Sequence, residues 1–305
     1  MKKTAIFGLL AVSLLVCHAC SDGPSTDRAG PKVATTIFPL YDIARNIVGD
    51  KLEVLEILPP GASPHTYELT PQQVKRLQGV VIVFSIGHGL DDWTRTIVNV
   101  LPDVRRAIVD KGINLRELSL PEEHSPHREG NHRHGGENPH YWLSIDNGKT
   151  IAENIAAEII RIDPDNESQY TANLDAYLLK LEATKEEIER RLRVLPHKKM
   201  ITFHDAWAYY ADEFGLEVVG AFEPFPGKHP TPRHLAELHE TARAHDVRAV
   251  FSEPQLSSET IASFVNDIGL KLYVLDPLGG VEGRNSYIEL MKYNTDIIAE
   301  ALSNE

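Results

Sequence analysis

From residue 32 onward, the chain alternates short apolar runs with segments of helical periodicity. Segment 39–50 places Leu40, Ile43 and Ile47 at the spacing of an amphipathic helix, and Gly49 follows as a stop signal. Strands that alternate with such helices predict a mostly parallel sheet. The elements predicted in this first half are strands at 32–38, 52–58, 80–87 and 106–110 and a further helix at 70–79.

The middle of the chain has a different pattern. Two helical segments, 147–163 and 166–195, are separated only by the sequence DPD. The second segment would be ~45 Å long at a rise of about 1.5 Å per residue, which is longer than most helices of globular proteins. Its length, polar face and central position predict a strut between two lobes.

The second half returns to alternating strands and helices. The predicted strands are 198–204, 216–222, 248–253 and 271–276, and the predicted helices are 231–245, 257–269 and 286–302. We therefore predict an α/β fold of two lobes, 32–165 and 196–305. Each lobe has a mostly parallel sheet with flanking helices, and the long helix 166–195 joins them.

The first 20 residues have the pattern of a secretory signal peptide rather than of a folded segment. Lys2 and Lys3 form a positive start, and the uncharged apolar run 5–16 is too short to span a bilayer. We expect this leader to be removed and the remaining protein to be extracytoplasmic, in the periplasm or at the cell surface.

The two cysteines of the chain both lie at the end of this leader. Cys17 and Cys20 have C-x-x-C spacing, but no strand–helix–strand pattern surrounds them, which argues against a redox pair. Cys20 follows the small Ala19 and is predicted to be a lipid-modified first residue, with 21–31 as a tether to the membrane. Cleavage after Ala19 without lipid attachment is the alternative. In either case the mature protein has no disulfide.

Charge narrows the range of partners. The 305-residue chain has a formal net charge of -13, which argues against a nucleic-acid partner. An acidic surface favours the approach of cations, although many soluble proteins share it. The sequence therefore directs attention to groups that could bind a positive ion.

Four such groups follow predicted strands or lie in predicted loops. In parallel α/β sheets, ligands bind beyond the carboxyl ends of the strands. His204 and Asp276 end strands of the second lobe, whereas His65 and His140 lie in loops of the first. A cleft between the lobes could collect all four. Three imidazoles and one carboxylate are good ligands for a divalent transition metal such as zinc.

A further group of histidines lies in the hydrophilic segment 122–137. Glu, Ser, Arg, Asn and Gly surround its histidines without apolar periodicity, so this segment cannot bury a core. It is either a weak secondary metal site or a polar surface loop with incidental affinity. The histidines concerned are His124, His127, His132 and His134.

Other polar residues have no grouping that points to a ligand. His88 is among these, and we expect it to be solvated or hydrogen-bonded. Asp205 and Glu253 lie near predicted strand ends, where each could orient an imidazole or form a structural ion pair. The segment 239–245 lacks the second histidine of the zinc-protease motif, because Arg243 stands at that position.

Several motifs resemble the solute-binding proteins that feed ABC importers of zinc and manganese, in particular their zinc-binding type (cluster A-I). The resemblance covers nearly all of the mature chain and follows the order of the family. It rests on TTIFPLYDIARNIVGD, LPPGASPHTYELTP, NPHYWLS, ITFHDAWAYYADEFGLE, FSEPQLSS and LYVLDPLGG.

The resemblance implies a ligand set and a role. By motif, the metal ligands are His65, His140, His204 and Asp276. Members that favour manganese tend to have Glu at the third position, so His204 favours Zn²⁺, with Mn²⁺ as the alternative cargo. The histidine-rich segment would be a capture loop, and the long helix a rigid link.

The implied protein is a monomer and not an enzyme. It binds Zn²⁺ between its lobes and delivers it to a membrane permease. The alternatives are a manganese or iron carrier on the same fold, a secreted zinc hydrolase and, with no residue in its support, a surface adhesin.

Overall fold

The computed structural model describes residues 31–118, 136–223, 229–255 and 258–303. The leader, Cys20 and the four histidines of the segment 122–137 lie outside the described residues. In the described part of the chain, no helix is both long enough and apolar enough to span a membrane.

The N-terminal lobe is built on a four-stranded parallel sheet with the strand order β2-β1-β3-β4. Its strands are β1 (Lys32–Thr35), β2 (Glu53–Glu56), β3 (Val80–Ser85) and β4 (Arg105–Ile108). The helices of this part are α1 (Phe38–Val48), α2 (Pro71–Arg76) and α3 (Thr94–Val100). A capping box between Thr70 and Gln73, followed by Pro71, starts α2 at the position that the sequence predicts.

The C-terminal lobe repeats this arrangement with the order β6-β5-β7-β8, again all parallel. Its strands are β5 (Lys199–Thr202), β6 (Glu217–Ala221), β7 (Ala249–Ser252) and β8 (Lys271–Val274). Its helices are α6 (Ala208–Phe214), α7 (Pro232–Ala244), α8 (Ser258–Ile268) and α9 (Tyr287–Ser303). In both lobes the first strand is central, so the carboxyl ends of corresponding strands can offer ligands in a similar way.

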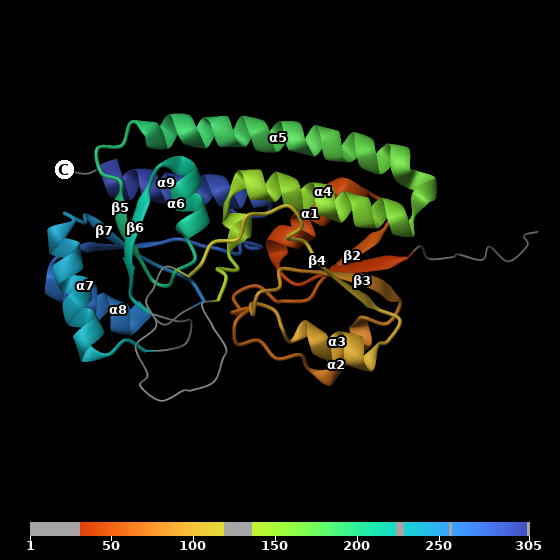
Figure 1. Cartoon of the computed structure of the whole chain (residues 1–305), viewed down its shortest axis with the longest axis horizontal. Helices are drawn as coiled ribbons and strands as arrows, with labels where there is room; N and C mark the ends of the chain where they lie inside the picture. Colours follow the sequence, from red (N-terminus) through yellow and green to blue (C-terminus); the bar gives the residue numbers. More distant parts are fainter. Residues whose placement is uncertain (1–30, 119–135, 224–228, 256–257, 304–305) are drawn as a thin grey trace, which may run out of the picture.

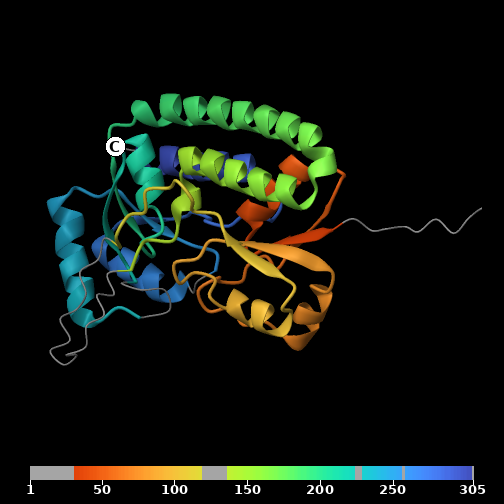
Figure 2. The same ribbon diagram turned by 45° about the vertical axis from the view of Figure 1, so that its right-hand side comes forward.

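Two long helices connect the lobes. The short helix η1 (Tyr141–Leu143) leads into α4 (Ile145–Ile162), and η2 (Pro164–Asn166) leads into α5 (Glu167–Arg193). Figures 1 and 2 both show α5 running above α4 and α9 and spanning the two lobes. The predicted long linking helix is thus present, with ends that differ from the predicted ones by one or two residues.

The largest hydrophobic cluster runs through both lobes, and each lobe also has a smaller cluster of its own. The largest cluster includes Val33 and Ile82 from the first sheet, Phe251 from the second, and Leu181 from α5. Polar contacts add to this packing, because Asn173 of α5 donates to the Ile47 carbonyl at 2.9 Å. A continuous core of this kind resists movement of one lobe relative to the other.

The predicted elements are present, but the strands are shorter than the apolar runs that predicted them. The run 32–38 ends as a strand at Thr35, since Pro39 at the first turn favours the start of α1. The helices α3 and α6 were not predicted, because each covers only seven residues and shows too little periodicity.

Tyr287 of α9 connects the second lobe to the segment before α4. Its side chain is fully buried, and its hydroxyl lies 2.6 Å from the Trp142 carbonyl and 3.1 Å from the Ser144 carbonyl. Gly148 of α4 leaves the space for this ring, because a Cβ atom there would lie 2.7 Å from the Tyr287 hydroxyl oxygen.

The substitution Gly148→Ala should therefore lower the free energy of unfolding by about 2 kcal/mol. Alanine favours a helix over glycine by roughly 1 kcal/mol, but displacement of Tyr287 costs more. Urea unfolding tests this, with Glu153→Ala on the exposed face of α4 as the control. A stabilised Gly148→Ala variant would show that the ring moves without cost.

Candidate metal centre

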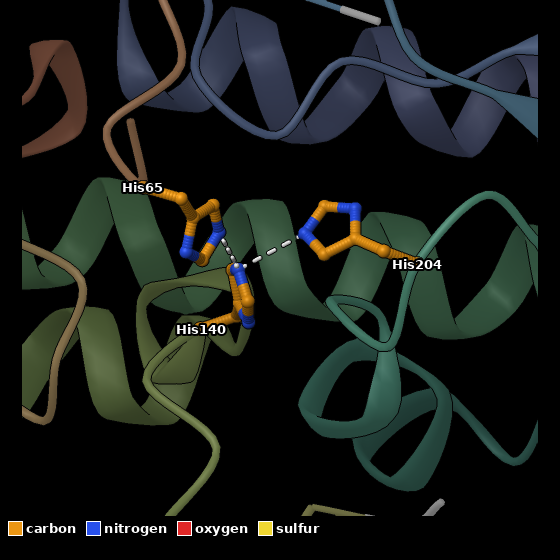
Figure 3. Close-up of side chains that lie close together, drawn as sticks. All are labelled: His65, His140 and His204. Atoms are coloured by element: carbon orange, nitrogen blue, oxygen red, sulfur yellow. Dashed lines mark hydrogen bonds between the residues drawn. The ribbon is translucent and has the colours of Figure 1, made fainter. Parts of the chain in front are cut away.

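Three histidines from separate parts of the chain face one another between the lobes. His65 lies in the loop after β2, His140 directly precedes η1, and His204 follows β5. Figure 3 shows their rings converging from three different segments. Among the described residues, these three form the group of His, Cys, Asp and Glu side chains whose ligating atoms lie within 4.8 Å of one another.

The spacing of their nitrogens matches that of metal ligands. His140 Nε2 lies 3.1 Å from His65 Nε2 and 3.1 Å from His204 Nε2. Imidazole nitrogens at ~2.0–2.1 Å from a tetrahedral zinc ion lie about 3.3 Å apart. Two of the three spacings are thus close to those around a zinc ion, and all three ligating atoms lie within 4.8 Å of one another.

Asn138 orients the His140 ring. The Asn138 amide group donates to the Asp205 carbonyl at 2.7 Å, so its Oδ1 atom faces the other way as an acceptor. This oxygen accepts from the backbone N–H of His140 at 3.0 Å and lies 2.9 Å from His140 Nδ1. The proton is thereby assigned to Nδ1, which leaves the Nε2 lone pair for a metal.

Glu253 has the corresponding role for His204. Its Oε1 atom lies 2.8 Å from His204 Nδ1 and accepts from the Trp207 indole N–H at 3.3 Å. Both His204 and Glu253 are buried. A carboxylate behind a ligating imidazole fixes the ring and increases its basicity.

Burial decides the charge of two of the three imidazoles. Desolvation, together with the smaller effect of a charge on His204, lowers the pKa of His65 to about 3. Desolvation likewise lowers the pKa of His140 well below its usual value. Burial also opposes the charge on His204, but Glu253 and the more distant Asp205 and Glu223 raise its pKa overall. His65 and His140 are thus neutral at pH 7 and can bind a metal, whereas a proton competes for His204.

The histidines line a cavity of about 330 Å³. Trp142 contributes to its wall, and its ring centroid lies 5.2 Å from that of His140. Gln255, Pro277 and Leu278 of the second lobe form another part of the wall. The surroundings are largely apolar, which strengthens electrostatic interactions inside the cavity.

Asp276, the fourth predicted ligand, does not belong to the group of three. It is buried, and its Oδ1 atom accepts from the backbone N–H groups of Leu278 at 2.9 Å and Gly279 at 3.1 Å. Gln255 donates to the same oxygen at 3.2 Å, and Arg284 Nε lies 3.3 Å from Oδ2. The carboxylate thus sits beside the cavity and is held by groups of its own lobe.

The supporting residues were only partly predicted. Glu253 was considered as an orienting partner, and it contacts His204. Asp205 contributes to His140 through its backbone carbonyl, by way of Asn138. Asn138 itself was not predicted, although the sequence N-P-H, with an amide two residues before the ligand, was available as a signal.

Comparisons with known proteins place the chain among relatives over nearly its whole length. The model of the family described as "Zinc-uptake complex component A periplasmic" matches residues 33–301. The "High-affinity zinc uptake system protein ZnuA" of Bacillus subtilis is 31% identical over 99% of this chain and 98% of its own length. The "Manganese ABC transporter substrate-binding lipoprotein PsaA" of Streptococcus anginosus is 30% identical over 99% of this chain and 100% of its own length.

A solved structure has the same fold. The "138-173 ZnuA deletion mutant plus zinc bound" superposes with a TM-score of 0.79 at 30% identity, covering 90% of this chain and 99% of that chain.

The substitution Glu253→Gln should weaken binding of a divalent metal by about 10–100-fold, because His204 loses the carboxylate that orients it. Isothermal calorimetry at several pH values separates this effect from the competition of a proton for His204, whose pKa Glu253 raises. Glu217→Gln on the exposed part of β6 is the control. Unchanged affinity in Glu253→Gln would show that packing alone orients His204.

Proposed function

Because this chain belongs to the family of the periplasmic zinc-uptake complex component A and is a metal ABC transporter substrate-binding protein, we propose that its cargo is Zn²⁺. It binds one ion between its lobes and delivers it to the membrane permease of its importer. The observation that carries this proposal is the convergence of three imidazoles, with His140 Nε2 3.1 Å from the Nε2 atoms of both His65 and His204.

The donor set favours zinc over manganese. Imidazole nitrogens suit zinc, whereas manganese prefers carboxylate and water oxygens. For a given set of ligands, the general order of affinities also places zinc above manganese. A manganese carrier is the second candidate, because PsaA, whose name states manganese, is a relative of similar identity.

Asp276 is proposed as the fourth ligand. Its neighbours Pro277 and Leu278 line the same cavity as the three histidines. Its Oδ1 atom accepts three hydrogen bonds, but among the described residues Oδ2 faces only Arg284, at 3.3 Å. A bound cation would attract Oδ2 and complete a tetrahedral site of three nitrogens and one oxygen.

This function requires binding and release but no chemical step. A zinc hydrolase needs an open coordination position for water and a nearby general base. The buried carboxylate of Glu253, which lines the same cavity, already contacts His204 and Trp207. We also propose that Cys20 carries a lipid anchor, and that His124, His127, His132 and His134 form a secondary, weaker site that captures zinc.

Calorimetry should detect one tight zinc ion per chain. His65→Ala or His204→Ala should weaken it by more than about 100-fold, since loss of a ligand costs more than loss of a supporting hydrogen bond. His229→Ala, at an exposed position, is the matched control. Deletion of 122–134 should leave the tight site unchanged and remove weaker binding only. Wild-type affinity in both ligand variants would overturn the assignment of the site.

Competition between zinc and manganese at fixed free-ion concentrations tests the choice of cargo. We expect zinc to displace manganese at equal free concentration, because the site offers three imidazoles. The Co²⁺-substituted protein should show the absorption of a four-coordinate ion without bound water, and Asp276→Asn should change this spectrum. Preference for manganese would favour the second candidate, and a water-bound cobalt ion would favour the hydrolase.

A further inference from the structure

The loop after β3 holds a histidine in an unfavourable backbone conformation. Gly87, His88 and Gly89 all have positive φ angles, of 80°, 52° and 84°. Glycine adopts this region freely, but for histidine it costs roughly 1–2 kcal/mol. Asp91 fixes the loop by accepting from the backbone N–H groups of Ile86 at 2.7 Å and Gly87 at 2.9 Å. The imidazole is thus retained at a position where glycine would be less strained, which suggests a functional reason.

Each ring nitrogen of His88 faces a carboxylate. Nε2 lies 2.8 Å from Asp110 Oδ2, and Nδ1 lies 2.5 Å from Glu137 Oε2. The edge of the ring packs against Tyr141, with the ring centroids 6.2 Å apart. Asp110 contacts Nε2 of His88 and so directs Nδ1 away from itself. Glu253 acts in the same way on His204, where it contacts Nδ1 and leaves Nε2 free to face the cavity.

His88 Nδ1 and Glu137 lie at a second cavity that reaches the three histidines. A cavity of about 560 Å³ is lined by His88 and Glu137 and also by His65, His140 and His204. The Glu137 side chain is 51% exposed, whereas that of His88 is 15% exposed. Glu137 is therefore open to solvent, and His88 lies in the same cavity as the three histidines.

The same cavity is also lined by the described residues on either side of 119–135. Leu118 and Gly136, the described residues that flank 119–135, line the cavity and are joined by a backbone hydrogen bond of 3.1 Å. The Tyr209 hydroxyl links the two chain segments near these residues. It accepts from the Arg116 backbone N–H at 2.9 Å and donates to the Asn138 carbonyl at 2.8 Å. An ion that enters the cavity beside the exposed Glu137 side chain would meet Glu137 and His88 before the three histidines.

We propose that His88 Nδ1 and Glu137 form a transit site for a divalent transition metal on its way to and from the three histidines. This proposal rests on the proposed function. One imidazole nitrogen and one carboxylate are suitable zinc ligands, but two donors bind weakly, as rapid transfer requires. Ligating atoms must be unprotonated, so an ion bound here replaces any proton between the two atoms.

A transit site lowers the barrier for entry and exit equally, so it changes rates but not the equilibrium. His88→Asn and Glu137→Gln should each lower the association rate constant of Zn²⁺ by about tenfold. The dissociation rate constant should fall by the same factor, and the Kd of the tight site should stay unchanged. Asparagine tolerates positive φ, so His88→Asn retains the loop.

The rates can be measured by stopped-flow fluorescence, because Trp142 lies beside His140. Dissociation is followed after mixing the loaded protein with excess EDTA, and thermal unfolding confirms that the variants fold. Asp92→Asn, an exposed residue of the same loop region, removes the same charge as Glu137→Gln and controls for general attraction of cations.

Three results would overturn the transit site. The first is wild-type rates in both variants. The second is slower association with unchanged dissociation, which indicates attraction by charge alone. The third is a weaker Kd caused by faster release, which indicates a role in the bound state. Failure of the wild-type protein to bind zinc tightly would instead overturn the proposed function itself, and the transit site with it.

Discussion

The arrangement depends on three imidazole lone pairs that are directed at one point. Nitrogens 3.1 Å apart with their lone pairs facing inward repel one another unless a cation or a proton lies between them. The fold must therefore hold each ring from behind. Asn138 does this for His140, and Glu253 does it for His204, in each case through Nδ1. The two partners differ in charge. Desolvation lowers the pKa of His140, which has a neutral amide at Nδ1, whereas Glu253 outweighs desolvation and raises the pKa of His204.

Holding these rings requires lobes that do not move apart freely. The largest buried cluster runs through both sheets and through α5, so the lobes share side-chain packing rather than a narrow hinge. Hydrogen bonds near the three histidines also join the lobes. The Asn138 side chain of the first lobe donates to the Asp205 carbonyl of the second. The Tyr209 hydroxyl of the second lobe donates in turn to the Asn138 carbonyl. The orientation of His140 is therefore set jointly by both lobes, and a change in either one reaches the ligand.

The sequence predicted what depends on local pattern. Alternating apolar runs and helical spacing predicted both parallel sheets and the helix Glu167–Arg193, and strand ends directed attention to His65 and His204. Contacts between distant segments could not be predicted in this way. Asn138 acquires its role only when Asp205, far away in the chain, lies beside it. His88 resembled an ordinary polar residue, because neither its positive φ nor its two carboxylate neighbours follow from its sequence context. Asp276 was predicted from its place at a strand end and from its motif, and the backbone hydrogen bonds that hold it come from the turn that follows it.

The three histidines differ in how firmly the surrounding residues hold them. His140 and His204 are buried, and each is held through Nδ1, whereas His65 is only partly buried. Within the described residues, the hydrogen-bond contact of the His65 ring is with His140 itself. The loop that carries His65 begins with the exposed residues Pro59 and Pro60, and the Trp93 indole N–H holds it through the Pro64 carbonyl at 3.1 Å. Of the three proposed ligands, His65 can therefore leave the centre at the lowest cost in buried polar contacts. In the proposed function, tight binding and release are compatible, since one loop can move while the shared core keeps His140 and His204 in place.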